Sequence, residues 1–167
     1  MTDSPTLTHL NPKGGVQMVD VGSKPNTVRT ALAAGRVVLG EEAYRAVSEK
    51  TVSKGDVLSI AQIAGIMGAK QTSKLIPLCH DLHLKGVDVE LTLEERAFSV
   101  DVQAYAKSVG QTGVEMEALT AVSIACLTIY DMCKSISKDL RITDIHLIAK
   151  TGGMSGDYRK SQLGEGA

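Results

Sequence analysis

The sequence predicts an α+β fold in which helices pack on one face of an antiparallel sheet. Residues 87–93 and 98–102 alternate apolar and polar side chains around a polar turn, as expected for an antiparallel hairpin with one solvated face. Residues 112–138 carry the longest helical pattern. The predicted order of elements is strand, two helices, two strands, helix, strand, which favours a two-layer sandwich.

The first half of the chain is predicted to contribute one strand and two helices. Residues 1–25 are polar and rich in Gly and Pro without a sustained period, which predicts an irregular arm. Residues 27–39 are ambiguous, because their alanines allow a helix whereas residues 36–39, before Gly40, favour an extended strand. We predict a strand. Residues 41–50 predict a short helix with acids in its first turn. Residues 55–76 predict a second helix with a stripe of small residues, which ends before Pro77.

The second half completes the sandwich. Residues 141–150 predict the last strand, and the polar residues 158–167 are expected to form a flexible tail. Neither a repeat nor a change of composition marks a second domain, so the 167 residues are expected to form a single domain. The nearest named architecture for this order of elements is the ferredoxin-like sandwich.

Composition narrows the classes of partner. Eighteen Lys and Arg against 19 Asp and Glu give a net charge of −1, which disfavours nucleic acid and membrane surfaces as partners. Four Tyr, one Phe and no Trp leave few side chains on which bases could stack. The three cysteines show no Cys-x-x-Cys spacing, and the N-terminal residues lack the apolar segment of a signal peptide. We therefore expect a cytoplasmic protein that crosses no membrane.

A thiol and two imidazoles lie close together after Pro77, in Cys79, His80 and His83. Zinc is one interpretation, although the adjacent pair does not have the spacing of a structural site. The second interpretation is a buried thiol beside a surface histidine. The third makes His80 a titratable donor to an anionic substrate.

The long predicted helix carries three acids with different interpretations. Thr112 and Glu115 fit a capping box, and Asp131 with Lys134 fits an exposed i, i+3 pair. Glu117 shares the Asp131 face with apolar neighbours, which makes both carboxylates candidates for shifted pKa values and for acid/base chemistry. Fourteen residues of helix separate these two acids by about 21 Å. If both are catalytic, either a long substrate spans them or a second subunit supplies one end of the pocket.

Four segments together resemble the cyclic pyranopterin monophosphate synthase family, which acts early in molybdenum cofactor biosynthesis. They are KGDV at 54–57, AKQTSKLIPLCH at 69–80, TGVEMEALTAVSIACLTIYDMCK at 112–134 and AKTGGMSGD at 149–157. The resemblance extends from about His9 to Asp157. It implies a ferredoxin-like subunit and a homohexamer built as three dimers, with active sites at the dimer interfaces.

The resemblance also implies a reaction. The substrate would be a 3′,8-cyclised dihydroguanosine triphosphate, a nucleotide derived from GTP, and the products would be cyclic pyranopterin monophosphate and diphosphate. No organic cofactor or protein-bound metal is expected, and Mg²⁺ would only accompany the triphosphate. The implied catalytic residues are Asp131 as acid/base, Lys134 and Lys54. The implied substrate-binding residues are Leu78, Cys79, His80, Met116, Glu117, Glu115, Lys70, Arg29, Lys24 and Lys150.

Two positions depart from the family pattern, and one alternative function stays open. Asp81 stands where members often have proline, and Met154 stands where lysine is common, which removes one possible phosphate contact. A non-catalytic nucleotide-sensing module is the alternative, because a fold does not determine function. For a pocket shared between subunits, we expect Lys54 and Asp131 to come from different chains.

Overall fold

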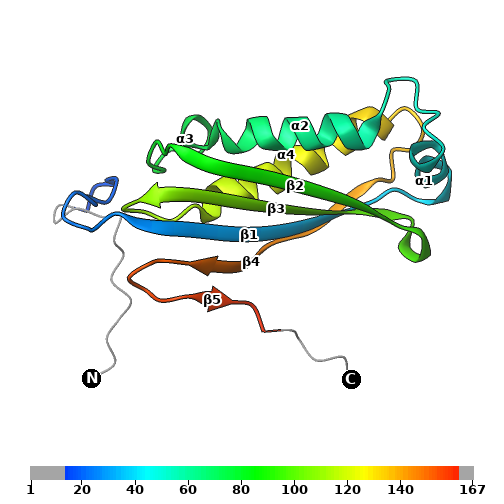
Figure 1. Ribbon diagram of the computed structural model, residues 1–167. Helices are drawn as coiled ribbons and strands as arrows, with labels where there is room; N and C mark the ends of the chain where they lie inside the picture. Colours follow the sequence, from blue (N-terminus) through cyan, green and yellow to red (C-terminus); the bar gives the residue numbers. More distant parts are fainter. Residues whose placement is uncertain (1–13, 162–167) are drawn as a thin grey trace.

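The computed structural model describes residues 14–161, which form one antiparallel sheet covered by helices on a single face (Figure 1). The sheet has five strands in the order β2-β3-β1-β4-β5. The first four strands in the order 2-3-1-4 have the ferredoxin-like arrangement, and β5 adds a short edge, so the predicted α+β class is confirmed. The elements are β1 (Thr27–Val38), α1 (Glu41–Ser48), α2 (Val57–Ala69), α3 (Thr72–Leu75), β2 (Leu84–Glu94), a 3₁₀ turn (Glu95–Ala97), β3 (Ser99–Gly110), α4 (Glu115–Cys133), β4 (Arg141–Thr151) and β5 (Tyr158–Arg159).

The ambiguous segment after the arm is a strand. β1 lies at the centre of the sheet, antiparallel to β3 on one side and to β4 on the other. Its side chains alternate strictly between buried and partly exposed positions from Arg29 to Val37, which is the period of a sheet with one covered face. The small residues Ala31, Ala33 and Gly35 face the helices, so the alanines that suggested a helix serve close packing.

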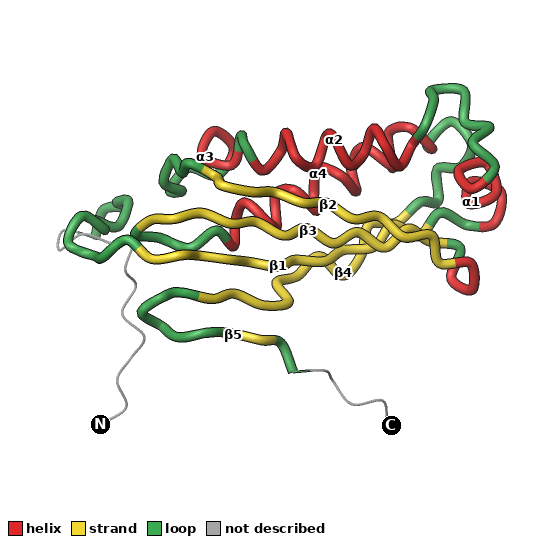
Figure 2. Tube along the Cα trace, in the orientation of Figure 1, coloured by secondary structure: helices red, strands yellow, loops and turns green. Residues whose placement is uncertain are grey.

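The helical layer consists mainly of α2 and α4, which lie side by side over the sheet (Figure 2). The predicted stripe of small residues on α2 is the contact surface with α4. A Cβ atom on Gly65 would lie 3.0 Å from the carbonyl oxygen of Ala121, and one on Gly68 would lie 2.7 Å from a side-chain carbon of Ile124. Glycine at these positions lets the two helices approach closely.

α4 is the central helix of the protein. It has the length and mean hydropathy, 1.4, of a membrane span, but 56% of the apolar window is buried inside the fold. Its buried residues include Ala118, Ala121, Ala125 and Ile129, which face the sheet or α2. The apolar character of α4 is therefore explained by its place in the core.

Several predicted boundaries are wrong. The helix predicted over 55–76 is two helices, because the chain turns at Lys70 and Gln71 before α3. Ile76 is extended, as a residue before proline prefers. The strands of the hairpin are longer than predicted, since small alternating residues continue β3 to Gly110. β5 interrupts the segment expected to be a flexible tail, of which residues 162–167 lie outside the described part, as do residues 1–13 of the predicted arm.

Candidate active site

Two hollows meet at the N-terminal end of α4. The first has a volume of about 470 Å³ and the second about 460 Å³. Both are lined by Lys24, Thr112, Gly113 and Glu115, so they are two lobes of one groove. We call them the basic lobe, which also contains Arg29 and Lys150, and the thiol lobe, which also contains Cys79 and His80.

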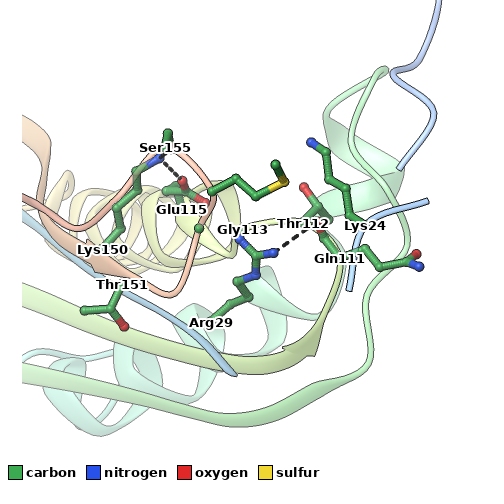
Figure 3. A pocket seen from close by; sticks show the side chains of 11 residues that line it. Lys24, Arg29, Gln111, Thr112, Gly113, Glu115, Lys150, Thr151 and Ser155 are labelled. Atoms are coloured by element: carbon green, nitrogen blue, oxygen red, sulfur yellow. Dashed lines mark hydrogen bonds and ion pairs between the residues drawn. The ribbon is translucent and has the colours of Figure 1, made fainter. Parts of the chain in front are cut away.

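The basic lobe is built from the start of β1, the end of β4 and the loop after β4 (Figure 3). Arg29 is only 5% exposed, and its guanidinium donates to the carbonyl oxygens of Gly110 and Gln111 at 3.3 Å each. Within the described residues it has no carboxylate partner, although buried charges are normally paired. A buried cation without a counter-ion beside an open hollow is suited to an anionic ligand.

Lys150 enters the basic lobe from the other side. Its ammonium lies 2.9 Å from the Glu115 carboxylate, and both side chains are about one quarter exposed (Figure 3). The predicted capping box is wrong, because α4 has Val114 at its N-cap with no side-chain cap, and Glu115 pairs with Lys150 instead. A Cβ on Gly113 would overlap the Glu115 carboxylate, so glycine leaves room for this ion pair.

The loop after β4 closes the basic lobe. Gly152 has φ +86°, and a Cβ there would lie 1.8 Å from the carbonyl oxygen of Val28, so only glycine fits. Thr27 donates its hydroxyl to the Gly152 carbonyl at 2.7 Å, and the Gly152 N–H donates to Asp157 at 3.1 Å. These bonds hold the loop against β1. Met154 lines the lobe and is 77% exposed.

The thiol lobe brings together residues from three segments. Leu78, Cys79 and His80 come from the segment after α3, Met116 and Glu117 come from the first turn of α4, and Val19 and Val21 come from the arm. Burial raises the pKa of the Cys79 thiol, with a smaller effect of the nearby Glu117 carboxylate. A thiol of this kind is a poor nucleophile at neutral pH.

Glu117 is the most perturbed acid in the groove. It is 4% exposed, and burial raises its pKa from 4.5 to about 7, with a smaller contribution from the charge of Glu115. A carboxyl with this raised pKa can hold a proton near neutral pH, so it can donate or accept a hydrogen bond. The end of α2 reaches the same carboxyl, since Lys70 and Glu117 line a small hollow of about 10 Å³.

The arm forms part of the wall of the thiol lobe. His80 Nε2 lies 2.9 Å from the carbonyl oxygen of Val19, and because a carbonyl only accepts, the imidazole donates. Gln111 donates its side-chain amide to the carbonyl of Gly22 at 3.2 Å. Nothing in the irregular sequence of the arm indicated that Val19 and Val21 would line a pocket.

A second cluster lies at the other end of α4, beside the loop that joins α1 to α2 (Figure 1). The Lys54 ammonium donates to the Asp131 carboxylate at 2.8 Å and to the Asp131 carbonyl at 2.7 Å. Lys134 contacts the other carboxylate oxygen at 2.7 Å. Hydrogen bonds and charge from Lys134 and Lys54 lower the pKa of Asp131 to about 2, and Asp131 in turn raises the pKa of Lys134.

This cluster corrects one expectation and refines another. Lys54 and Asp131 are in direct contact within one chain, so the expectation that they come from different chains is wrong for this pair. Both carboxylates have shifted pKa values, as expected, but in opposite directions, because Glu117 is buried whereas Asp131 is exposed and paired with two lysines. Burial dominates at one end of the helix and ion pairing dominates at the other.

The structure thus divides the predicted site residues into two groups. The basic and thiol lobes collect Lys24, Arg29, Leu78, Cys79, His80, Glu115, Met116, Glu117 and Lys150, with Lys70 beside Glu117. The cluster at the C-terminal end of α4 collects Lys54, Asp131 and Lys134. No group of three metal-ligating side chains occurs among residues 14–161, and all three cysteines are free thiols.

Known proteins of one family match this sequence along almost the whole chain. Residues 18–153 match the MoaC family. A protein of Salinibacter ruber named cyclic pyranopterin monophosphate synthase is 64% identical over 159 residues, which cover 95% of this chain and 94% of the relative. A protein of the same name from Heliobacterium modesticaldum is 53% identical over 93% of this chain and 98% of the relative. A mitochondrial protein of that name from Arabidopsis thaliana is 55% identical over 95% of this chain and 59% of its own length.

Proposed function

The chain belongs to the MoaC family, and from that premise we propose that it converts a 3′,8-cyclised dihydroguanosine triphosphate into cyclic pyranopterin monophosphate with release of diphosphate. It is an enzyme of the lyase type in molybdenum cofactor biosynthesis. The observation that carries this function is the identity of 64% to a named synthase over 95% of the chain. The geometry of the two ends of α4 supports the roles proposed below.

We assign the triphosphate to the basic lobe. Arg29 supports this assignment, because it is buried without a carboxylate partner in the described chain and forms part of the wall of the lobe. Lys24 and Lys150 bring two further cations to the same hollow. The Glu115 carboxylate contacts the Lys150 ammonium at 2.9 Å, and a phosphate oxygen can compete for the same ammonium.

We assign the guanine-derived ring system to the thiol lobe. This lobe combines an apolar wall with a few polar groups, as ligand pockets do. The Glu117 carboxyl, with a pKa of about 7, can exchange protons with ring nitrogens during ring opening and closure. His80 can supply a second donor once its bond to the Val19 carbonyl is released.

The cluster at the C-terminal end of α4 is assigned to the phosphate chemistry. A substrate hydroxyl forms a bond to the α-phosphorus, and the bond to the β-phosphate oxygen breaks to release diphosphate. The ammonium groups of Lys54 and Lys134 can stabilise the negative charge that develops on the leaving group. Asp131, whose pKa is about 2, is a weak base while both lysines contact it. It becomes a better proton acceptor when substrate oxygens draw the lysines away.

One chain cannot supply both ends of its own α4 to a compact substrate. Glu117 and Asp131 are about 21 Å apart along the helix axis at 1.5 Å per residue. We therefore propose a dimer in which the lobes of one subunit face the Lys54, Asp131 and Lys134 cluster of its partner. A homohexamer of three such dimers is the assembly we propose for solution, and the cytoplasm is the proposed location.

The direct test is turnover of the purified protein with the cyclised nucleotide. We expect stoichiometric release of diphosphate with formation of the cyclic phosphate, without an added organic cofactor or a protein-bound metal. Mg²⁺ is proposed only as a companion of the triphosphate, so a titration with a chelator should change substrate affinity rather than inactivate the protein permanently. Tight binding of the nucleotide without diphosphate release would favour the alternative, a nucleotide-sensing module.

A further inference from the structure

The loop that carries Lys54 has an unusual backbone for its length. It joins α1 to α2 over residues 49–56, and two of its residues have positive φ, Lys50 at +56° and Gly55 at +104°. Val52, in its middle, is 6% exposed and packs against the core. The Gly55 N–H donates to the carbonyl of Val52 at 3.0 Å, which makes the end of the loop a tight turn. Lys54 lies within this turn.

One carboxylate joins the two ends of the loop. Asp56 Oδ1 accepts the backbone N–H of Ser59 at 3.1 Å, which caps the N-terminus of α2. Asp56 Oδ2 lies 3.4 Å from the ammonium of Lys50 at the start of the loop. Among the α-helices in the described chain, α2 alone has a side-chain cap at its N-terminus. Asp56 thus holds the turn from its α2 side, while Val52 anchors the middle of the loop in the core.

The reach of Lys54 depends on that turn. Its ammonium is 2.7 Å from the Asp131 carbonyl and 2.8 Å from the Asp131 carboxylate, at the exposed end of α4. A lysine has four rotatable bonds, so an exposed ammonium stays in one place only if its backbone is held. Asp56 is two residues from Lys54 and ties the end of the loop to the backbone N–H of Ser59 and to Lys50.

We propose that Asp56 is a positioning residue that acts through Lys54, by fixing the turn from which this lysine reaches Asp131. The proposal rests on the proposed catalytic role of Lys54. Asp56 itself does not touch the Lys54, Asp131 and Lys134 cluster in the described structure. Its effect on the reaction is therefore indirect, and it is separable from a general effect on stability.

The test compares two variants that both weaken α2. Asp56→Ala removes the cap and the contact with Lys50. Gln62→Ala, the matched control, removes a 2.8 Å bond from α2 to the carbonyl of Val89 on the sheet and leaves the loop intact. An N-cap side chain shifts the equilibrium of the turn it holds roughly 2- to 30-fold. We expect kcat to fall by a factor in that range in Asp56→Ala, with a smaller change in KM, and to stay near the wild-type value in Gln62→Ala.

The second measurement needs no substrate. The pKa of Asp131 can be followed by NMR of carboxyl carbons, with Lys54 and Lys134 as the charged groups that contact it. We expect the pKa of Asp131 to rise in Asp56→Ala, because Lys54 contacts it for less of the time, and to be unchanged in Gln62→Ala. Asp56→Asn and Asp56→Ser, which keep a capping oxygen, should restore most of the wild-type behaviour.

Two outcomes overturn the proposal. One is an unchanged pKa of Asp131 in Asp56→Ala, and the other is an equal loss of kcat in Asp56→Ala and Gln62→Ala. If Asp56→Ala does not fold, Lys50→Ala replaces it, because it removes only the contact with Oδ2 and should raise the pKa of Asp131 by a smaller amount. An unchanged value in Lys50→Ala then counts against the proposal as well. Absence of diphosphate release by the wild-type protein would refute the proposed function and leave the NMR result valid.

Discussion

A mixed-subunit experiment tests the shared pocket directly. Glu117→Gln disables the thiol lobe of its own chain, and Asp131→Asn disables the cluster at the other end of α4. Each variant alone should be nearly inactive, with kcat reduced about 10²-fold or more, as for loss of a positioned acid or base. The two sites lie about 21 Å apart on one helix, so in the proposed dimer every pocket takes one site from each chain.

The expected recovery follows from counting pockets. When equal amounts of the two variants exchange subunits at random, about half of the dimers contain one copy of each variant. Such a dimer has one pocket with both sites intact and one pocket with both sites disabled. Half of the pockets in half of the dimers are then active, so diphosphate release should recover to roughly a quarter of the wild-type rate. The assay is release of diphosphate, with subunit exchange followed by native mass spectrometry.

The structure supplies a matched negative control. Lys54 and Asp131 contact each other at 2.8 Å within one chain, so both belong to the same side of the proposed pocket. Mixing Lys54→Ala with Asp131→Asn should therefore restore no activity, although exchange occurs to the same extent. Two results would refute the shared pocket. One is recovery of activity in this control, and the other is no recovery in the mixture of Glu117→Gln with Asp131→Asn although subunit exchange has been demonstrated.

Three further predictions concern the pocket and the helical layer. Between pH 4.5 and about 7, Glu117 keeps its proton in the folded protein and loses it in the unfolded chain. The contribution of the protonated Glu117 to the free energy of unfolding is therefore complete below pH 4.5 and is lost as the pH rises through 7. Denaturant titration should accordingly find Glu117→Gln more stable than wild type at pH 8, by up to about 3 kcal/mol, and not at pH 4. Gly68→Ala places a carbon 2.7 Å from Ile124 and should destabilise the protein by about 1–3 kcal/mol in a thermal scan, whereas an unchanged Tm would show that α2 can move away from α4. Gly152→Ala directs a carbon at the Val28 carbonyl and should weaken binding of inorganic diphosphate several-fold by calorimetry, an outcome that unaltered affinity would contradict.

The architecture could be predicted from the sequence because apolar residues recur with a clear period in strands and helices that bury one face. Strict alternation identified the hairpin, and the small-residue stripe, for which no partner was predicted, lies against α4 in the structure. The break at Lys70 was missed, since Thr72 continues the helical pattern and its hydroxyl bonds to the carbonyl of Ala69 across the turn. Boundaries that depend on such local bonds leave little trace in apolar spacing.

The sequence indicated which residues belong to the candidate site, but it indicated less well how these residues are arranged. Spacing correctly placed Glu117 and Asp131 far apart on one helix, which is a property of helix geometry alone. The ion pairs of the site were not predictable. Lys54 contacts Asp131, which lies 77 residues further along the chain, and Glu115 pairs with Lys150 instead of capping α4. Contacts between distant segments depend on the tertiary fold, which a local sequence pattern does not describe.

The arm has a consequence for how the pocket comes into being during synthesis. Val19 and Gly22 are translated long before the partners that hold them, His80 and Gln111, which lie 61 and 89 residues further along the chain. These contacts close loops of 61 and 89 residues, whereas the pairing of β1 with β4 closes a loop of 121 residues between Thr30 and Thr151. The thiol lobe can therefore close once Gln111 has emerged from the ribosome, whereas the basic lobe must wait for β4 and the loop after it, which supply Lys150 and Gly153.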